Sequence, residues 1–302
     1  MFDLKESSTM RGISLMIAAT ILFSIMHASI KYMSTNLHPF EIAFFRNLFG
    51  LFVIAPWLIK YGIQPLKTKK IKLHAARSFF NVLAMLSFFY SLSITPLAEV
   101  STLGFTAPLF ASILAIIFLK EIVGIRRIIA IIFGFVGTIV VIDPVYSSVD
   151  IGHLLVLFSA SVWSISLIII KILGRTESSV TITSYMVLFM IPLSGFAAYF
   201  YWETPTLYDL LFLLLIGITG TSAQMLLAQA LREGDTSIIM PFDFLKLIWA
   251  VCIGFLFFSE IPEINVWIGS IMIFCSTLYI AYREKVLSGK GKGKKLSQPV
   301  DQ

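Results

Sequence analysis

The amino-acid sequence predicts an all-α polytopic membrane protein, with ten transmembrane helices arranged as two inverted five-helix repeats around a central cavity. This prediction rests on three observations. Hydrophobic residues make up 58% of the 302 residues and charged residues only 13%, about half of the charged share that is usual in a soluble domain. The apolar residues fall into ten long segments, and the two halves of the chain resemble each other.

The ten segments are long enough to be spans, because a helix needs about 20 apolar residues to cross the hydrocarbon of a bilayer. They are continuously apolar rather than alternating, which favours helices over the strands of a membrane barrel. The expected spans are residues 12–33, 38–59, 73–93, 97–119, 127–143, 151–171, 180–200, 208–231, 236–258 and 264–282. The connections between them are short, so no soluble domain is predicted.

Basic residues gather at alternate ends of these spans. The loop 60–72 contains five lysines, whereas four other loops contain no lysine or arginine. Those four lie near residues 94–97, 143–150, 201–208 and 259–264. By the positive-inside rule, both termini are predicted to be cytoplasmic, in a bacterial inner membrane. Residues 1–11 would then form a short cytoplasmic N-terminus and residues 286–302 a disordered basic cytoplasmic tail.

The chain resembles itself at a spacing near 140 residues. The aligned pairs are Gly12 with Gly152, Lys31 with Lys171, and Glu121 with Glu260. This alignment predicts a first repeat over residues 12–143 and a second over residues 151–283. Five spans is an odd number, so the second repeat would be inverted relative to the first. Inverted repeats are common in secondary transporters, whose substrate sites lie near the midplane between the repeats.

Four of the charged side chains inside the apolar spans are candidate site residues. Arg46 lies eight residues into the second span, about 12 Å deep. Lys246 lies ten residues into the ninth span, Asp243 is one turn earlier on the same face, and Glu41 is nearer the outer end. Each charge costs about 2.5–3.5 kcal/mol at the centre of an inserting helix, so we expect these side chains to face a wet interior.

In that interior, Arg46 and Lys246 would bind a carboxylate or phosphate, and Asp243 would bind a cationic group. Glu41 would add a further negative charge to the same substrate site. The alternative is an internal ion pair, such as Arg46 with Asp243, that only fixes the packing of the helices.

Other candidate residues are rings that could stack on a substrate and an amide that could hydrogen-bond it. They are Trp163, Phe105, Tyr90 and Gln224. Ordinary packing, or a bond to a neighbouring helix, explains each of them as well. His27 is a candidate proton carrier, with a packing role as the alternative. Pro108 and Pro241 should disturb the fourth and ninth spans and allow them to bend during gating.

Several motifs resemble those of a known family. "FTAPLFASILAIIFLKE" closes the fourth span and "FFSEIP" closes the ninth. Together with the repeat of five plus five spans, they make residues 10–283 similar to the EamA type of the drug/metabolite transporter superfamily. This resemblance implies a basket of helices around a central cavity, with the fifth and tenth spans peripheral, and metabolite transport without covalent chemistry.

Two shorter stretches, "HPFEIAFFR" and "PFDFLKL", resemble the S-adenosylmethionine uptake branch of that superfamily. In that branch the ninth span is expected to carry a cation followed by an anion, whereas here Asp243 precedes Lys246. The resemblance implies a small charged or zwitterionic metabolite, such as S-adenosylmethionine or an amino-acid-like solute, moved by alternating access.

Other functional classes fit the sequence less well. No HExxH, GxSxG or cysteine–histidine cluster indicates an enzyme, and no GxxxxGK[ST] motif indicates an ATP-driven pump. A channel would favour a ring of like charges. The alternative that stays open is an exporter of amphipathic drugs or lipid-like metabolites. The expected partners are a small-molecule substrate and the lipid bilayer, with no nucleic acid, cofactor or metal.

Overall fold

The computed structural model describes residues 2–119, 125–144, 150–233 and 236–296, and all regular structure in these ranges is helical. The α-helices are α1 Phe2–Met33, α2 Pro39–Tyr61, α3 Ile71–Ile94, α4 Leu97–Gly104, α5 Ala107–Leu119, α6 Ile125–Ile142, α7 Ile151–Leu173, α8 Ser179–Tyr199, α9 Leu207–Glu233, α10 Thr236–Ile239, α11 Leu245–Phe258 and α12 Ile264–Leu296. Two short 3₁₀ helices, η1 Gln64–Leu66 and η2 Met240–Phe244, complete the order.

Ten helical stretches within the described residues are long and apolar enough to cross a membrane, which confirms the ten predicted spans. Large apolar side chains such as Phe52, Phe196 and Phe255 are exposed on the outside of the bundle, as expected of a surface that faces lipid. One boundary differs, because α12 continues as a helix to Leu296 and not only to residue 286, where we expected a disordered tail to begin. Glu121, one of the residues aligned between the repeats, lies outside the described ranges.

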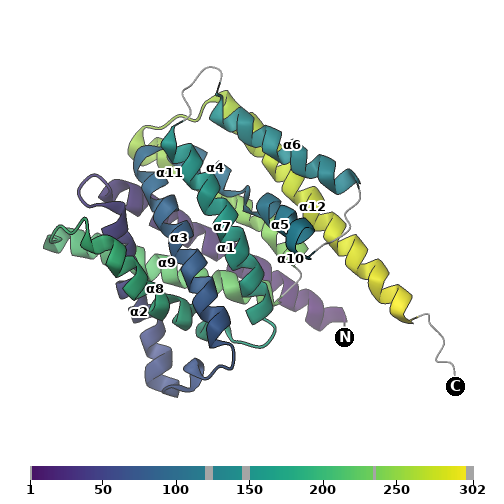
Figure 1. Ribbon diagram of the computed structural model, residues 1–302, viewed down its shortest axis with the longest axis horizontal. Coiled ribbons are helices and arrows are strands. Elements are labelled where there is room, and N and C mark those ends of the chain that lie inside the picture. Colours follow the sequence, from purple (N-terminus) through teal and green to yellow (C-terminus); the bar gives the residue numbers. More distant parts are fainter. Residues whose placement is uncertain (1, 120–124, 145–149, 234–235, 297–302) are drawn as a thin grey trace.

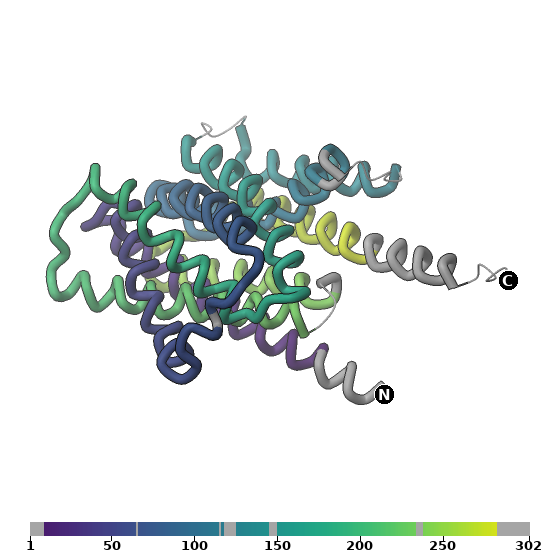
Figure 2. Tube along the Cα trace, turned by 60° about the horizontal axis from the view of Figure 1, so that its bottom comes forward, coloured from purple at the N-terminus to yellow at the C-terminus, as the bar shows by residue number. Residues whose placement is uncertain are grey.

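The helices pack as a bundle with a separate pair at one edge (Figure 1). Within the bundle, α1 packs against α9, α3 against α7, and α2 against α8 and α9. The pair consists of α6 and α12, which lie side by side away from the centre. These two helices are the fifth and tenth spans, so they occupy the peripheral position that the family resemblance implies. The tube view from a second direction shows the same pair along one edge of the bundle (Figure 2).

Glycines explain how closely α6 and α12 approach each other. A Cβ atom added to Gly137 would lie 2.8 Å from Cβ of Met272 and 3.0 Å from the carbonyl oxygen of Gly269. Real Cβ atoms do not pack this tightly against backbone, so only glycine fits at this crossing. Small residues are a usual way to bring two membrane helices into contact.

The fourth and ninth spans are broken near prolines. The fourth span changes from α4 to α5 at Phe105 and Thr106, just before Pro108, and the ninth contains the 3₁₀ segment η2 around Pro241. Proline has no N–H to donate and clashes with the preceding turn, which interrupts a helix at such positions. The two breaks touch, since the rings of Phe105 and Phe244 stack with centroids 4.1 Å apart.

One end of the bundle is fastened by an ion pair between Lys31 at the end of α1 and Glu260 after α11. Their charged atoms are 2.6 Å apart. Lys31 also donates to the carbonyl oxygen of Thr95 at 2.7 Å, and the backbone N–H of Leu97 donates to Glu260 Oε2 at 2.9 Å. Every charged atom in this cluster therefore has a protein partner, and the cluster ties α1, α11 and the start of α4 together.

Candidate functional site

A cavity of about 160 Å³ lies inside the bundle, between the two broken spans and the helices around them. Its volume is about ten times what one water molecule needs. Side chains from α1, α2, α3, α7, α8, α9 and α12 also contribute to its wall. The lining is mostly apolar and aromatic with a few polar groups, which is the usual character of a small-molecule site.

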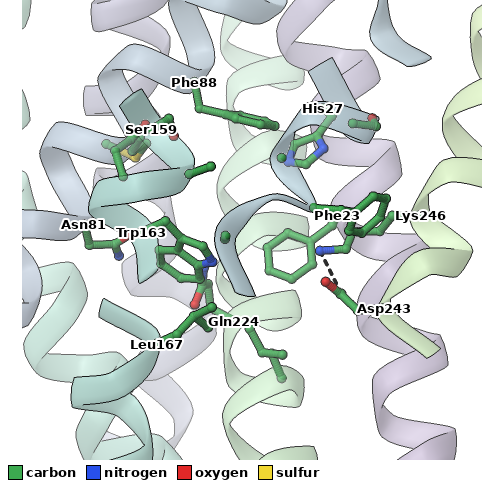
Figure 3. A pocket seen from close by; sticks show the side chains of 18 of the residues that line it. Phe23, His27, Asn81, Phe88, Ser159, Trp163, Leu167, Gln224, Asp243 and Lys246 are labelled. Carbon is green, nitrogen blue, oxygen red and sulfur yellow. Dashed lines mark hydrogen bonds and ion pairs between the residues drawn. The ribbon is translucent and has the colours of Figure 1, made fainter. Parts of the chain in front are cut away.

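Asp243 and Lys246 form an ion pair on the wall of this cavity (Figure 3). Lys246 Nζ lies 2.7 Å from Asp243 Oδ1, and the two side chains are 20% and 13% exposed. The same Nζ lies over the rings of Phe23, at 5.0 Å, and Phe105, at 5.7 Å, in cation–π geometry. The carboxylate and the aromatic faces therefore hold the ammonium group in place, and its charge is largely compensated by the protein.

Arg46 lines the same cavity but has no such compensation. It is only 3% exposed. Its Nη1 donates to Asn47 Oδ1 at 2.8 Å, and its buried Nε has no hydrogen-bond partner. In the described part of the chain no carboxylate lies within ion-pair distance of Arg46, and Asp243 pairs with Lys246 instead. The expected alternative of a structural ion pair between Arg46 and Asp243 is therefore not what the structure contains.

Space for the Arg46 side chain depends on Gly220 of α9. A Cβ atom on Gly220 would lie 3.0 Å from Arg46 Nε and would also collide with the sulfur of Met26. Asn47 fixes the other side of the guanidinium and is itself anchored by a 3.0 Å hydrogen bond to Ser194 of α8. Three helices thus shape a slot for one guanidinium on the cavity wall, and Nη1 is its only nitrogen with a hydrogen-bond partner among the described residues.

Five further predicted residues lie on the cavity wall. They are His27, Phe105, Pro108, Trp163 and Gln224. Figure 3 shows Trp163 and the Lys246–Asp243 pair on opposite sides of the view. Gln224 Oε1 is buried without a hydrogen-bond partner, and His27 contacts the ring of Phe88, with centroids 4.9 Å apart. An unpaired amide oxygen and an aromatic lining leave hydrogen-bonding and stacking capacity for a ligand.

Three predicted residues are not among the residues that line the cavity. Glu41 is five residues before Arg46, a rotation of about 140° around the helix, and its Oε2 accepts from the backbone N–H of Glu203. Tyr90 is nine residues after Asn81, about half a turn away, and lies among the rings of His38 and Phe40 instead. Pro241 precedes the lining residue Asp243 without lining the cavity itself.

Several further residues line the cavity, and three methionines among them were not predicted as site residues. Met26, Met85 and Met190 give the wall three flexible thioether side chains, and Asn81 adds an amide. Methionine inside an apolar span carries no sequence signal that separates a cavity wall from ordinary packing. Asn81 does carry a signal, because an amide inside a span has to find a partner.

The ten-span helical bundle is that of a multi-pass membrane protein, and an internal cavity lined partly by charged groups is typical of a transporter. The model of the EamA-like transporter family matches residues 10–143 and again residues 150–282, so the chain belongs to the EamA-like transporter family. It is a small-metabolite transporter and not an enzyme.

Curated relatives and a solved structure match the chain over nearly its whole length. An S-adenosylmethionine uptake transporter of Rickettsia bellii is 32% identical over 92% of this chain and 96% of that protein. A riboflavin transporter of Vibrio cholerae is 29% identical over 91% of this chain and 94% of that protein. A protein of known crystal structure is 15% identical, with a TM-score of 0.63 over 92% of this chain and 97% of the other, which shows a shared fold.

Proposed function

We propose that this chain carries a small metabolite with an anionic group and a planar ring across the bacterial inner membrane, and that S-adenosylmethionine is the first candidate. The single observation that supports this most strongly is Arg46, a buried guanidinium on the cavity wall without a carboxylate partner in the described residues. A substrate carboxylate would supply the missing charge, and a guanidinium binds a carboxylate with two parallel hydrogen bonds.

The individual charged groups of the lining match those of such a substrate, whereas their sum does not select it, because S-adenosylmethionine is itself a net cation. Arg46 and Lys246 are positive and Asp243 is negative, so the wall carries a net charge of +1. Glu41 does not line the cavity and does not change this balance. The ring of Trp163 offers a face for an adenine ring or for a sulfonium cation. Asp243, Phe23 and Phe105 hold Lys246, and a substrate ammonium group would share them with Lys246 or displace it. S-adenosylmethionine carries all of these groups.

Riboflavin is the second candidate, because riboflavin transporters are among the relatives and the cavity is largely apolar and aromatic. Riboflavin has a large planar ring but no carboxylate or phosphate. Its binding would therefore depend on the aromatic wall and much less on Arg46. An exporter of amphipathic drugs or lipid-like compounds would be equally insensitive to Arg46.

Alternating access is the proposed transport mechanism. Two observations support it: the family model matches the chain twice, with five spans in each match, and the two broken spans meet at the cavity. Discontinuous helices at a repeat interface are typical of secondary transporters. We propose that both termini are cytoplasmic, since the lysine-rich loop would then lie inside.

Counterflow in liposomes tests the proposed function. The purified protein is reconstituted with unlabelled S-adenosylmethionine inside the vesicles, and entry of labelled S-adenosylmethionine is followed. We expect transient accumulation above the level of empty liposomes, without ATP. If labelled riboflavin accumulates in the same assay and S-adenosylmethionine does not, riboflavin is the substrate instead. If neither compound accumulates while amphipathic dyes leave the vesicles, the export alternative is correct.

A further inference from the structure

Arg77 is a second buried cation outside the cavity lining. It lies on α3 and is 1% exposed. Its Nη1 donates to the carbonyl oxygen of Ile182 at 2.9 Å, and its Nη2 approaches the sulfur of Met186 at 3.5 Å. Its Nε has no hydrogen-bond partner, and no ion pair involves Arg77 in the described residues. A guanidinium held only by neutral groups keeps most of its charge uncompensated.

His74, one turn earlier on α3, is equally buried and has fewer partners. It is 1% exposed, and neither ring nitrogen has a hydrogen-bond partner. Its ring stacks on Tyr185 of α8, with centroids 4.6 Å apart. More than 90% of buried polar groups in proteins are hydrogen-bonded. Three unpartnered nitrogens on two neighbouring residues therefore leave hydrogen-bonding capacity for a ligand, which would reach them only after the surrounding helices move, because the cavity lining includes neither residue.

His74, Arg77 and Asn81 follow one face of α3, at spacings of three and four residues. We call these three residues the α3 polar stripe. Asn81 lines the central cavity, and His74 lies in the first turn of α3, directly after the lysine-rich segment 67–72. About 10 Å along the helix separate the two ends of the stripe. The stripe thus connects the cavity with the lysine-rich end of the bundle.

The face of α8 opposite the stripe presents two methionine side chains. Arg77 and Asn81 contact the sulfurs of Met186 and Met190, which are one turn apart on α8. Methionine is unbranched and changes rotamer easily. Arg77 also lies near enough to Arg46 for the two charges to repel each other. Arg77 is therefore a second cation within electrostatic reach of an anion that leaves Arg46.

We infer that Arg77 and His74 form a second binding station for the anionic group of the substrate, a carboxylate or a phosphate, between the cavity and the lysine-rich end. This inference rests on the proposed function. The station is used when α3 and α8 separate, after the substrate has left Arg46. Several weak sites of one sign in series let a charged solute enter and still leave.

Substitutions at Arg77 test the station against a purely structural role. Arg77→Met removes the charge, Arg77→Lys keeps it, and Arg126→Met is the control at an exposed position. We expect Arg77→Met to bind S-adenosylmethionine within about twofold of wild type, as measured by thermal shift, and to lose at least about tenfold in counterflow rate. Arg77→Lys should recover much of that rate, because the charge is retained.

A structural clamp between α3 and α8 predicts a different pattern. Lysine cannot bridge the Ile182 carbonyl and the Met186 sulfur as arginine does, so both variants would lose melting temperature and transport together. That pattern, or wild-type counterflow in Arg77→Met, would overturn the inference. So would failure of both variants to fold while Arg126→Met folds.

A second measurement uses sulfate and does not depend on the substrate. The melting temperature in sodium sulfate is compared with that in sodium chloride at equal ionic strength. In an Arg46→Met background, which lacks the cavity guanidinium, we expect sulfate to stabilise the protein. The double variant Arg46→Met/Arg77→Met should lose this stabilisation. Equal sulfate effects in the two proteins would refute the second station even if S-adenosylmethionine is not the substrate.

Discussion

Lys31 and Arg46 are both cations inside apolar helices, but only Lys31 has a carboxylate partner among the described residues. Lys31 is paired with Glu260 at 2.6 Å and donates to the Thr95 carbonyl oxygen. Arg46 is more deeply buried and has one neutral partner, Asn47. A paired cation at the junction of several elements stabilises the fold. A buried cation without a counter-charge reduces the stability of the fold. Such a cation is retained where a ligand supplies the missing negative charge.

The largest effect should follow from removing the Arg46 charge. Arg46→Met should weaken S-adenosylmethionine binding about 10- to 100-fold, because a hydrogen bond to a charged group contributes about 1.5–3 kcal/mol. The ligand-free protein should melt at the same or a higher temperature than wild type, since an uncompensated buried charge has been removed. Thermal shift with and without ligand measures both. A lower melting temperature together with unchanged affinity would make Arg46 a structural residue.

Lys31→Gln should show the opposite pattern. It leaves Glu260 without its counter-ion, and we expect a loss of about 1–3 kcal/mol of stability. Glu260→Gln should cost a similar amount, and the double variant should cost less than the sum of the two. Ligand affinity should stay close to wild type. If Lys31→Gln binds substrate as poorly as Arg46→Met and melts at the wild-type temperature, Lys31 has a role in binding and not in stability.

A smaller effect should follow from Gly220→Ala, which narrows the slot of Arg46. The added Cβ would lie 3.0 Å from Nε of Arg46, so the guanidinium has to shift. We expect a severalfold loss of affinity in the binding assay and only a small change of melting temperature, because the preference of a helix for alanine over glycine, about 0.5–1 kcal/mol, offsets part of the cost of displacing the Met26 sulfur. Unchanged affinity would show that the position of Arg46 is not critical.

The smallest effect should come from His38, which caps α2 between the first two spans. Its Nδ1 accepts from the N–H of Phe40, and burial lowers the pKa of His38 below the usual value near 6.5, against the opposite influence of Glu203. The neutral ring is favoured in the folded protein, so its contribution is present above about pH 6.5 and declines as the pH falls through the lowered pKa.

Melting temperatures measured between pH 7.5 and pH 5.5 check this expectation. His38→Asn keeps a side-chain acceptor for the cap but cannot titrate. Its melting temperature should therefore change less over this interval than that of the wild type. An equal change in both proteins would assign the pH dependence to other groups.

Much of the fold was predictable because the bilayer sets the length and polarity of each span. All ten spans appear, and Pro108 and Pro241 mark the two broken ones. The end of α12 was not predictable from composition, since glycine and lysine indicated a disordered tail where the helix continues to Leu296. The side of a helix that a residue faces was also harder to predict. The charge of Glu41 and the ring of Tyr90 suggested these two residues, and helical rotation turns both away from the cavity.

The charged core of the site was predictable from the cost of burying charge, which identified Arg46, Asp243 and Lys246. The ion pair between Asp243 and Lys246 was not predictable. The sequence gives no distances, and Asp243 could equally have paired with Arg46. The burial of Arg77 was not predictable, because this residue lies near the basic end of its span, where a long side chain can reach water. The structure instead turns it into the contact between α3 and α8.

Binding of the substrate carboxylate by Arg46 is tested most directly by removing the carboxylate from the ligand and the guanidinium from the protein, singly and together. Binding of S-adenosylmethionine and of its decarboxylated form is measured for wild type and Arg46→Met. We predict that loss of the carboxylate weakens binding to wild type at least about tenfold and leaves binding to Arg46→Met almost unchanged. An equal loss in both proteins would contradict the account, because the carboxylate would then bind elsewhere.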